Sequence, residues 1–131
     1  MKYFLCVFDS IYLGIPSECT ERVISVFRTQ SSVFETEGQD AFISLPLLFG
    51  RADLPAPHGI VLKSRGKERK TTLLAPPLDI DLEIPEEAVF SVPKAFSGKL
   101  RFVKGACFIK KDQADRLVFI LDPEMLTGEF K

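Results

Sequence analysis

Residues 78–84 read Leu-Asp-Ile-Asp-Leu-Glu-Ile, which is the clearest structural signal in this chain of 131 residues. Aliphatic and acidic side chains alternate with a period of two, so a strand would carry its aliphatic side chains on one face and its acidic ones on the other. The pattern predicts a half-buried β-strand. Asp79, Asp81 and Glu83 would then form a solvated face, because carboxylates about 7 Å apart along a strand need further ligands to hold a cation.

Short strands are predicted on both sides of this segment, because β-branched and aromatic runs alternate with turn residues. These strands are expected at residues 3–8, 11–15, 23–27, 41–45, 60–62, 71–74, 100–109 and 117–121. Residues 28–40 are predicted to be a polar connection, and residues 110–115 a polar turn. Helix is limited to single turns after Pro16 and Pro85 and to a short C-terminal helix that Asp122 caps.

Residues 51–59 are the best linker candidate, because they contain two prolines and one glycine and show no periodicity. About four strands are predicted before this linker and four to five after it. Strands this short avoid exposed edges best by curling closed, so the fold class is mostly β with two small barrels. Subdomain 1 is expected at residues 1–50 and subdomain 2 at residues 60–131.

The composition excludes several classes of function. The chain has 17 basic and 18 acidic residues, which is not the electrostatic footprint of a nucleic-acid-binding protein. No apolar run approaches the roughly 18 residues needed to span a bilayer, so no direct membrane insertion is expected. Three cysteines without a CxxC pair fit a reducing cytoplasm, where Cys6, Cys19 and Cys107 are expected to be small buried hydrophobic residues.

No catalytic, cofactor-binding or metal-binding residue is predicted. The single histidine, His58, has no cysteine or acidic residue at ligand spacing, so it is interpreted as a surface residue. The glycines are scattered and form no phosphate-binding loop. A basic cluster at a hairpin tip is interpreted as solvated, with a patch that faces a partner as the alternative. The cluster comprises Lys63, Arg65, Lys67, Arg69 and Lys70.

The order of these segments resembles the CheW-like domain, an adaptor of bacterial chemotaxis that also occurs as the regulatory domain of the histidine kinase CheA. Near the start, Tyr12-Leu-Gly-Ile-Pro16 and Thr20-Glu-Arg-Val-Ile24 are similar to the family's first hairpin and the segment after it. Phe42-Ile-Ser-Leu45 is similar to a central stretch. Ile80–Val89 and Leu117–Leu126 resemble a valine-rich strand and the closing signature. The order and spacing of these motifs carry the resemblance across nearly the whole chain.

The resemblance implies two five-stranded SH3-like barrels packed on each other in one CheW-like domain. It also implies a cytoplasmic location at membrane-associated receptor arrays and no catalysis. The implied partners are the regulatory domain of a CheA-type histidine kinase and the cytoplasmic tip of a chemoreceptor. A CheW-like module of a signalling pathway outside chemotaxis is the first alternative. A small-ligand-binding β-barrel is another, although the inward positions are filled by Phe, Leu and Ile.

Four residues are predicted partner contacts from their positions within the matched motifs: Glu21, Arg22, Val23 and Glu37. Val23 is equally well interpreted as a core residue. If Gly38 is the family's glycine, Glu37 stands where the family has an arginine, and Ser44 stands where it has an aspartate. Reversal of the charge at a contact arginine costs roughly several kcal/mol against an unchanged partner. Weaker binding to a standard receptor tip is therefore expected.

Overall fold

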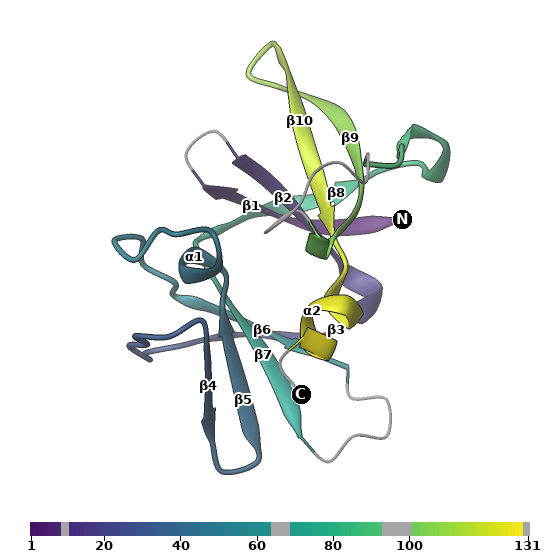
Figure 1. Ribbon diagram of the computed structural model, residues 1–131. Helices are drawn as coiled ribbons and strands as arrows, with labels where there is room; N and C mark the ends of the chain where they lie inside the picture. The colour runs from purple at the N-terminus through teal and green to yellow at the C-terminus, as the bar shows by residue number, and fades with distance from the viewer. Residues whose placement is uncertain (9–10, 64–68, 93–100, 130–131) are drawn as a thin grey trace. The chain divides into compact units, whose positions relative to one another are not determined.

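A computed structural model describes residues 1–8, 11–63, 69–92 and 101–129, with the side chains of residues 79–81 excepted (Figure 1). The first sheet has the strand order β8-β1-β2-β10-β9. Its strands are β1 (Lys2–Phe8), β2 (Ile11–Pro16), β8 (Leu78–Glu83), β9 (Val103–Lys111) and β10 (Ala114–Leu121). The second sheet has the order β3-β6-β7-β5-β4. Its strands are β3 (Thr20–Ser25), β4 (Phe34–Glu37), β5 (Asp40–Ser44), β6 (His58–Leu62) and β7 (Lys70–Ala75).

Helical structure is short throughout the described residues. Two single turns are η1 (Ser17–Cys19) and η2 (Glu86–Ala88), and the α-helices are α1 (Leu45–Leu48) and α2 (Pro123–Glu129). The predicted cap of the C-terminal helix is confirmed, because a side-chain oxygen of Asp122 accepts the backbone N–H of Met125 at 3.2 Å. The predicted fold class is confirmed as well: the chain is mostly β, with two five-stranded sheets and short helical turns.

Both sheets join two hairpins in the same way. In the first sheet, the second strands of the hairpins β1–β2 and β9–β10 pair in parallel, as β2 with β10. In the second sheet, β7 of the hairpin β6–β7 pairs in parallel with β5 of the hairpin β4–β5. A fifth strand flanks each sheet, β8 beside β1 and β3 beside β6. The two sheets therefore share a topology that no internal sequence repeat reveals.

The chain divides into compact units at places that differ from the predicted subdomain boundaries. The first unit contains Met1–Ser17 together with Asp79–Glu129, and the second contains Glu18–Leu78. Residues 51–59, which the sequence indicated as a linker between subdomains, lie inside the second unit. Arg51 and Asp53 form an ion pair there at 3.1 Å, and the last two residues of the segment begin β6. The reason is the parallel pairing of β2 with β10, which joins the start of the chain to its end.

Several strand boundaries also differ from the predictions. Strand β4 lies within residues 28–40, which the sequence analysis treated as a polar connection. Its sequence, Phe-Glu-Thr-Glu, is half acidic and therefore lacks the usual strand composition. Strand β3 begins at Thr20 rather than at residue 23. The turn between β9 and β10 contains only Asp112 and Gln113, because Lys111 pairs with Ala114.

The core of the first unit explains two of the three cysteines. Cys107 belongs to a buried cluster in which the other members are Tyr3, Leu5, Ile84, Val118 and Ile120. Burial raises the pKa of the Cys6 thiol to about 12, and it raises the pKa of Cys107 as well. A raised pKa keeps a thiol protonated and unreactive. The prediction of small buried residues is thus confirmed for Cys6 and Cys107, whereas Cys19 is half-buried.

The turn between β9 and β10 yields a prediction about stability. Asp112 and Gln113 have φ angles of 55° and 62°, in the left-handed region that glycine occupies without steric cost. We expect Gln113→Gly to raise the free energy of unfolding by about 0.5–1 kcal/mol, measured by urea denaturation. The control is Gln39→Gly in the two-residue turn between β4 and β5. There Gly38, and not Gln39, has the positive φ, so no gain is expected. An equal effect of both variants would contradict this account.

Candidate interaction surface

The four predicted contact residues all lie in the second sheet. Glu21, Arg22 and Val23 are on the edge strand β3, and Glu37 ends β4, the opposite edge strand. The register of the sheet places Thr20 beside Leu62, and it places Asp40 between Lys70 and Glu37. Glu21 and Glu37 are therefore brought to the same end of one sheet, although they lie on different edges.

Glu21 is part of an ion pair rather than a free carboxylate. Its side chain accepts a hydrogen bond from the Lys70 ammonium at 3.0 Å. This hydrogen bond and the charge of Lys70 hold the pKa of Glu21 below its ordinary value. Lys70 was expected on a solvated hairpin tip, whereas it begins β7 and contacts β3. Within that basic cluster Lys63 and Arg69 are exposed, and the expectation for Arg65 and Lys67 lies outside the described residues.

The exposure of Val23 decides between its two interpretations. Its side chain is 38% exposed, which is too much for a core residue and favours a surface contact. Arg22 is exposed beside it. The neighbouring Ile24 and Val26 point to the other face of the strand, where they pack over Gly59. Strand β3 thus has one packed face, and Val23 remains available on the other.

Gly59 allows this close approach of β3 to β6. A Cβ atom at residue 59 would lie 2.6 Å from a methyl carbon of Val26 and 2.8 Å from the Thr72 methyl carbon. We therefore expect Gly59→Ala to lower the free energy of unfolding by about 1–3 kcal/mol, measured by thermal or urea denaturation. The control is Gly128→Ala, since a Cβ atom there meets no atom within 4 Å. Similar losses for both variants would contradict the close-packing argument.

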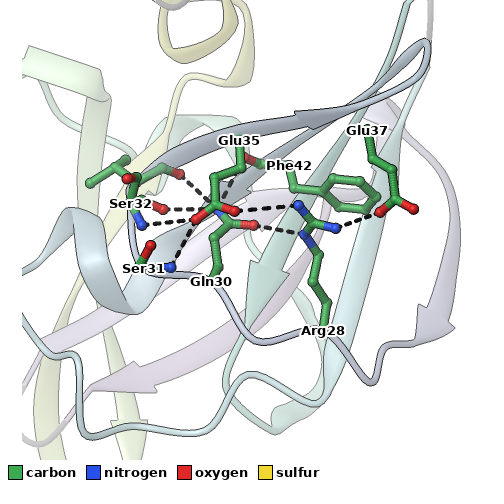
Figure 2. Close-up of polar contacts among 8 residues, drawn as sticks. Arg28, Gln30, Ser31, Ser32, Glu35, Glu37 and Phe42 are labelled. Carbon is green, nitrogen blue, oxygen red and sulfur yellow. Dashed lines mark hydrogen bonds and ion pairs between the residues drawn. The ribbon is translucent and has the colours of Figure 1, made fainter.

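Glu37 belongs to a polar cluster around Arg28 (Figure 2). The Arg28 guanidinium donates to Glu37 at 2.7 Å and to the side-chain oxygen of Gln30 at 3.1 Å, and it lies 3.5 Å from Glu35. It also stacks over the ring of Phe42, with its central carbon 4.3 Å from the ring centre. Arg28 therefore joins the segment after β3 to the hairpin β4–β5.

Glu35 secures the rest of this connection. One of its carboxylate oxygens accepts the backbone N–H groups of Ser31 and Ser32 at 2.8 and 2.9 Å. These two bonds, with the charge of Arg28, lower the pKa of Glu35. The Gln30 amide nitrogen donates to the carbonyl oxygens of Val33 and Phe42. Residues 28–35 therefore form a hydrogen-bonded connection.

Sequence reasoning missed Arg28, whose position changes the electrostatics of the β4 edge. Glu37 remains 75% exposed, but its charge faces the Arg28 guanidinium. The sequence carried only a weak signal for these ion pairs. Glu35 and Glu37 follow Arg28 by seven and nine positions, and they occupy alternate positions of a short strand. Only the return of the chain beside β4 brings these charges together.

A second exposed apolar group lies in the first unit and was also missed. Phe90 forms a β-bridge with Ala106 of the edge strand β9. Its ring is 5.8 Å from the ring of Phe108, measured between centroids. Phe90 is 44% exposed and Phe108 is 63% exposed. Exposed aromatic pairs of this kind are typical of protein-contact surfaces.

The described residues offer no group of three or more His, Cys, Asp or Glu side chains that is placed to hold a metal ion. His58 begins β6, half-buried and opposite Ser25. Among the helices of the described ranges, none is long and apolar enough to cross a membrane. In the described part of the chain, the candidate sites are therefore edge strands and exposed side chains.

The fold of this chain consists of two five-stranded sheets of the same connectivity. Among solved structures, the crystal structure of the scaffolding protein TtCheW from Thermoanaerobacter tengcongensis is similar. The TM-score is 0.66 and the sequence identity 16%, over 92% of this chain and 87% of that chain. No protein-family model and no curated protein sequence matches this chain. The likeness is therefore one of fold: the chain has a CheW-like fold.

The cluster around Arg28 predicts a specific dependence of stability on pH. Because the folded-state pKa of Glu35 is lowered, its contribution is present at neutral pH. It is lost as the pH falls from the ordinary value of 4.5 through the lower folded-state value. We expect Glu35→Gln to lower Tm at about pH 7 and to reduce the further fall of Tm below about pH 4.5, measured by circular dichroism. Glu87→Gln, which removes an exposed carboxylate from η2, is the control. An unchanged acid dependence in Glu35→Gln would contradict this assignment.

Proposed function

We propose that this protein is a CheW-like adaptor that couples chemoreceptors to a CheA-type histidine kinase by protein–protein binding. It would act without catalysis or a cofactor, in the cytoplasm, at membrane-associated receptor arrays. The observation that supports this proposal most is the likeness of fold to a scaffolding protein over 92% of this chain.

The proposed contacts are Glu21, Arg22, Val23 and Glu37. On β3, the exposed Val23 follows the charged residues Glu21 and Arg22, so an apolar side chain lies next to polar ones, as between the centre and the rim of an interface. On β4, the ion pair with Arg28 partly compensates the charge of Glu37. A partner that meets this edge therefore meets an arginine together with a glutamate. The penalty expected from charge reversal at residue 37 is accordingly reduced.

The alternatives lead to different binding results. A CheW-like module of a pathway outside chemotaxis would bind its own kinase through the same edge, but it would not bind a receptor tip. A small-ligand-binding barrel would need a roomy interior. In the described residues, the interior positions are filled by large aliphatic side chains such as Leu13, Ile43 and Leu73, all fully buried. No specific observation therefore favours the ligand-binding alternative.

The test is binding of the purified chain to an isolated CheA-type regulatory domain and, separately, to a receptor cytoplasmic tip, measured by calorimetry. We expect Val23→Lys to weaken binding to the regulatory domain by about tenfold or more, because a lysine there would place a charge at the apolar centre. The matched control is Ile11→Lys, another β-branched residue with 37% exposure, which lies on β2 of the first unit.

Binding of the regulatory domain that Val23→Lys weakens and Ile11→Lys preserves would support both the function and the site. Equal effects of the two variants would reject β3 as the site. A chain that binds neither the regulatory domain nor the receptor tip would reject the adaptor function. Binding to the regulatory domain alone would favour a pathway outside chemotaxis.

A further inference from the structure

Strand β3 has one edge that no other strand of the described chain covers. It pairs with β6 on one side and ends the strand order of the second sheet on the other. The backbone N–H of Val26 donates to the carbonyl oxygen of Pro57 at 2.9 Å, so the pairing continues one residue beyond the strand. This bond also tells which backbone groups face β6 and which face the free edge.

Hydrogen-bonded and non-hydrogen-bonded residues alternate along an antiparallel pair. Because Val26 bonds across to Pro57, Ile24 also faces its partner Gly59. The backbone N–H and C=O groups of Val23 and Ser25 must then point to the free edge. Phe27 lies beyond the end of β3, but it follows Val26, whose N–H still bonds to Pro57, so its backbone is expected to continue the same alternation. These three residues are spaced two apart, so their side chains share one face. The free edge therefore offers backbone donors and acceptors together with a valine, a serine and a phenylalanine.

The two edges of this sheet are protected to different degrees. Natural sheets keep edges from pairing by making them short and charged. Strand β4 has four residues, and Glu35, Glu37 and Arg28 surround it with charge. On β3 the charged residues Glu21 and Arg22 lie near the start of the strand, and Glu21 is paired with Lys70. The side chains that follow on the exposed face, Val23, Ser25 and Phe27, carry no charge. Val23 is 38% exposed and Phe27 is 101% exposed. Of these two edges, β3 is the one suited to accept another strand.

We infer that the free edge of β3 pairs in antiparallel fashion with β3 of a second copy of this chain, with a two-fold axis at Ser25. A second copy is the expected partner because β3 is complementary to itself. In this register, Val23 of each copy lies opposite Phe27 of the other. An aromatic and a β-branched side chain form a favourable cross-strand pair. A two-fold axis at Ile24 would instead place each Phe27 opposite a charged Glu21. The axis at Ser25 places Arg22 of one copy opposite Arg28 of the other, but the charge of Arg28 is paired with Glu35 and Glu37 of its own copy. The inference does not rest on the proposed function.

The dimer is expected to be weak, because one strand pair buries less surface than the roughly 1,600 Å² of a standard interface. We therefore expect sedimentation equilibrium of the full chain to show a reversible monomer–dimer equilibrium at concentrations up to roughly 1 mM. Phe27→Ser should weaken dimerisation by about tenfold while Tm stays the same, because Phe27 is fully exposed.

Two proline variants test the backbone geometry. Ser25→Pro removes an N–H that faces the free edge, a position where edge strands accept proline. It should abolish the dimer with little change in stability. Ile24→Pro removes an N–H that faces β6 and should lower stability strongly.

A disulfide cross-link tests the register. Opposite Cα atoms of a hydrogen-bonded pair are about 5.5 Å apart, within the range of a disulfide. Ser25→Cys should therefore cross-link two copies in a glutathione buffer.

Thr29→Cys is the matched control for cross-linking, because residue 29 is exposed but lies four positions from the axis. Cross-linking by Ser25→Cys but not by Thr29→Cys, with dimerisation weakened in Phe27→Ser and lost in Ser25→Pro, would establish the pairing. A chain that stays monomeric over the whole concentration series would overturn it, as would a dimer that these variants leave unchanged. If Ser25→Pro fails to fold, Phe27→Ser and the cysteine pair still decide the outcome.

Discussion

The parallel pairing of β2 with β10 is the constraint on which the organisation of the chain depends. Parallel strands cannot be joined by a tight turn, so the chain must leave the first sheet after β2 and return to it later. Residues 18–78 fill this interval and build a second sheet of their own, in which β5 and β7 form another parallel pair. The edge strands of both sheets follow from these two pairings: β8 and β9 in one, β3 and β4 in the other.

The edges differ in how their exposed groups are satisfied. At β4, the Arg28 guanidinium pairs with the Glu35 carboxylate, which also accepts the backbone N–H groups of the neighbouring connection. These contacts hold that connection in place. At β9, Phe90 covers part of the edge through a single bridge to Ala106. At β3, the backbone groups of Val23 and Ser25 face away from the sheet without a strand beside them in the described chain. Since the interiors are filled by aliphatic side chains, binding is expected at such edges.

The sequence predicted those parts of the fold in which local pattern and burial agree. The alternation in residues 78–83 and the apolar runs of β1, β2 and β10 identify strands because their composition and periodicity are typical of strands. Strand β4 was not predicted because two of its four residues are acidic, which is unusual for a strand. Their charges are paired with Arg28, seven and nine positions earlier, once the chain turns back beside β4. The candidate contacts on β3 were predicted from the family resemblance, and the exposure of Val23 became evident only once β3 proved to be an edge strand.

By itself, the sequence determined a mostly β chain with short strands and buried thiols at Cys6 and Cys107. These properties depend on composition and on periods of two residues, which are local. The tertiary structure alone decided which strands pair in parallel, where the units divide, and which charges meet around Arg28. The parallel pairings and the division into units depend on contacts between residues far apart in the chain, and a local pattern does not specify which distant segment will pair with a strand. The charges around Arg28 lie within nine positions of one another, and they meet because the chain turns back beside β4.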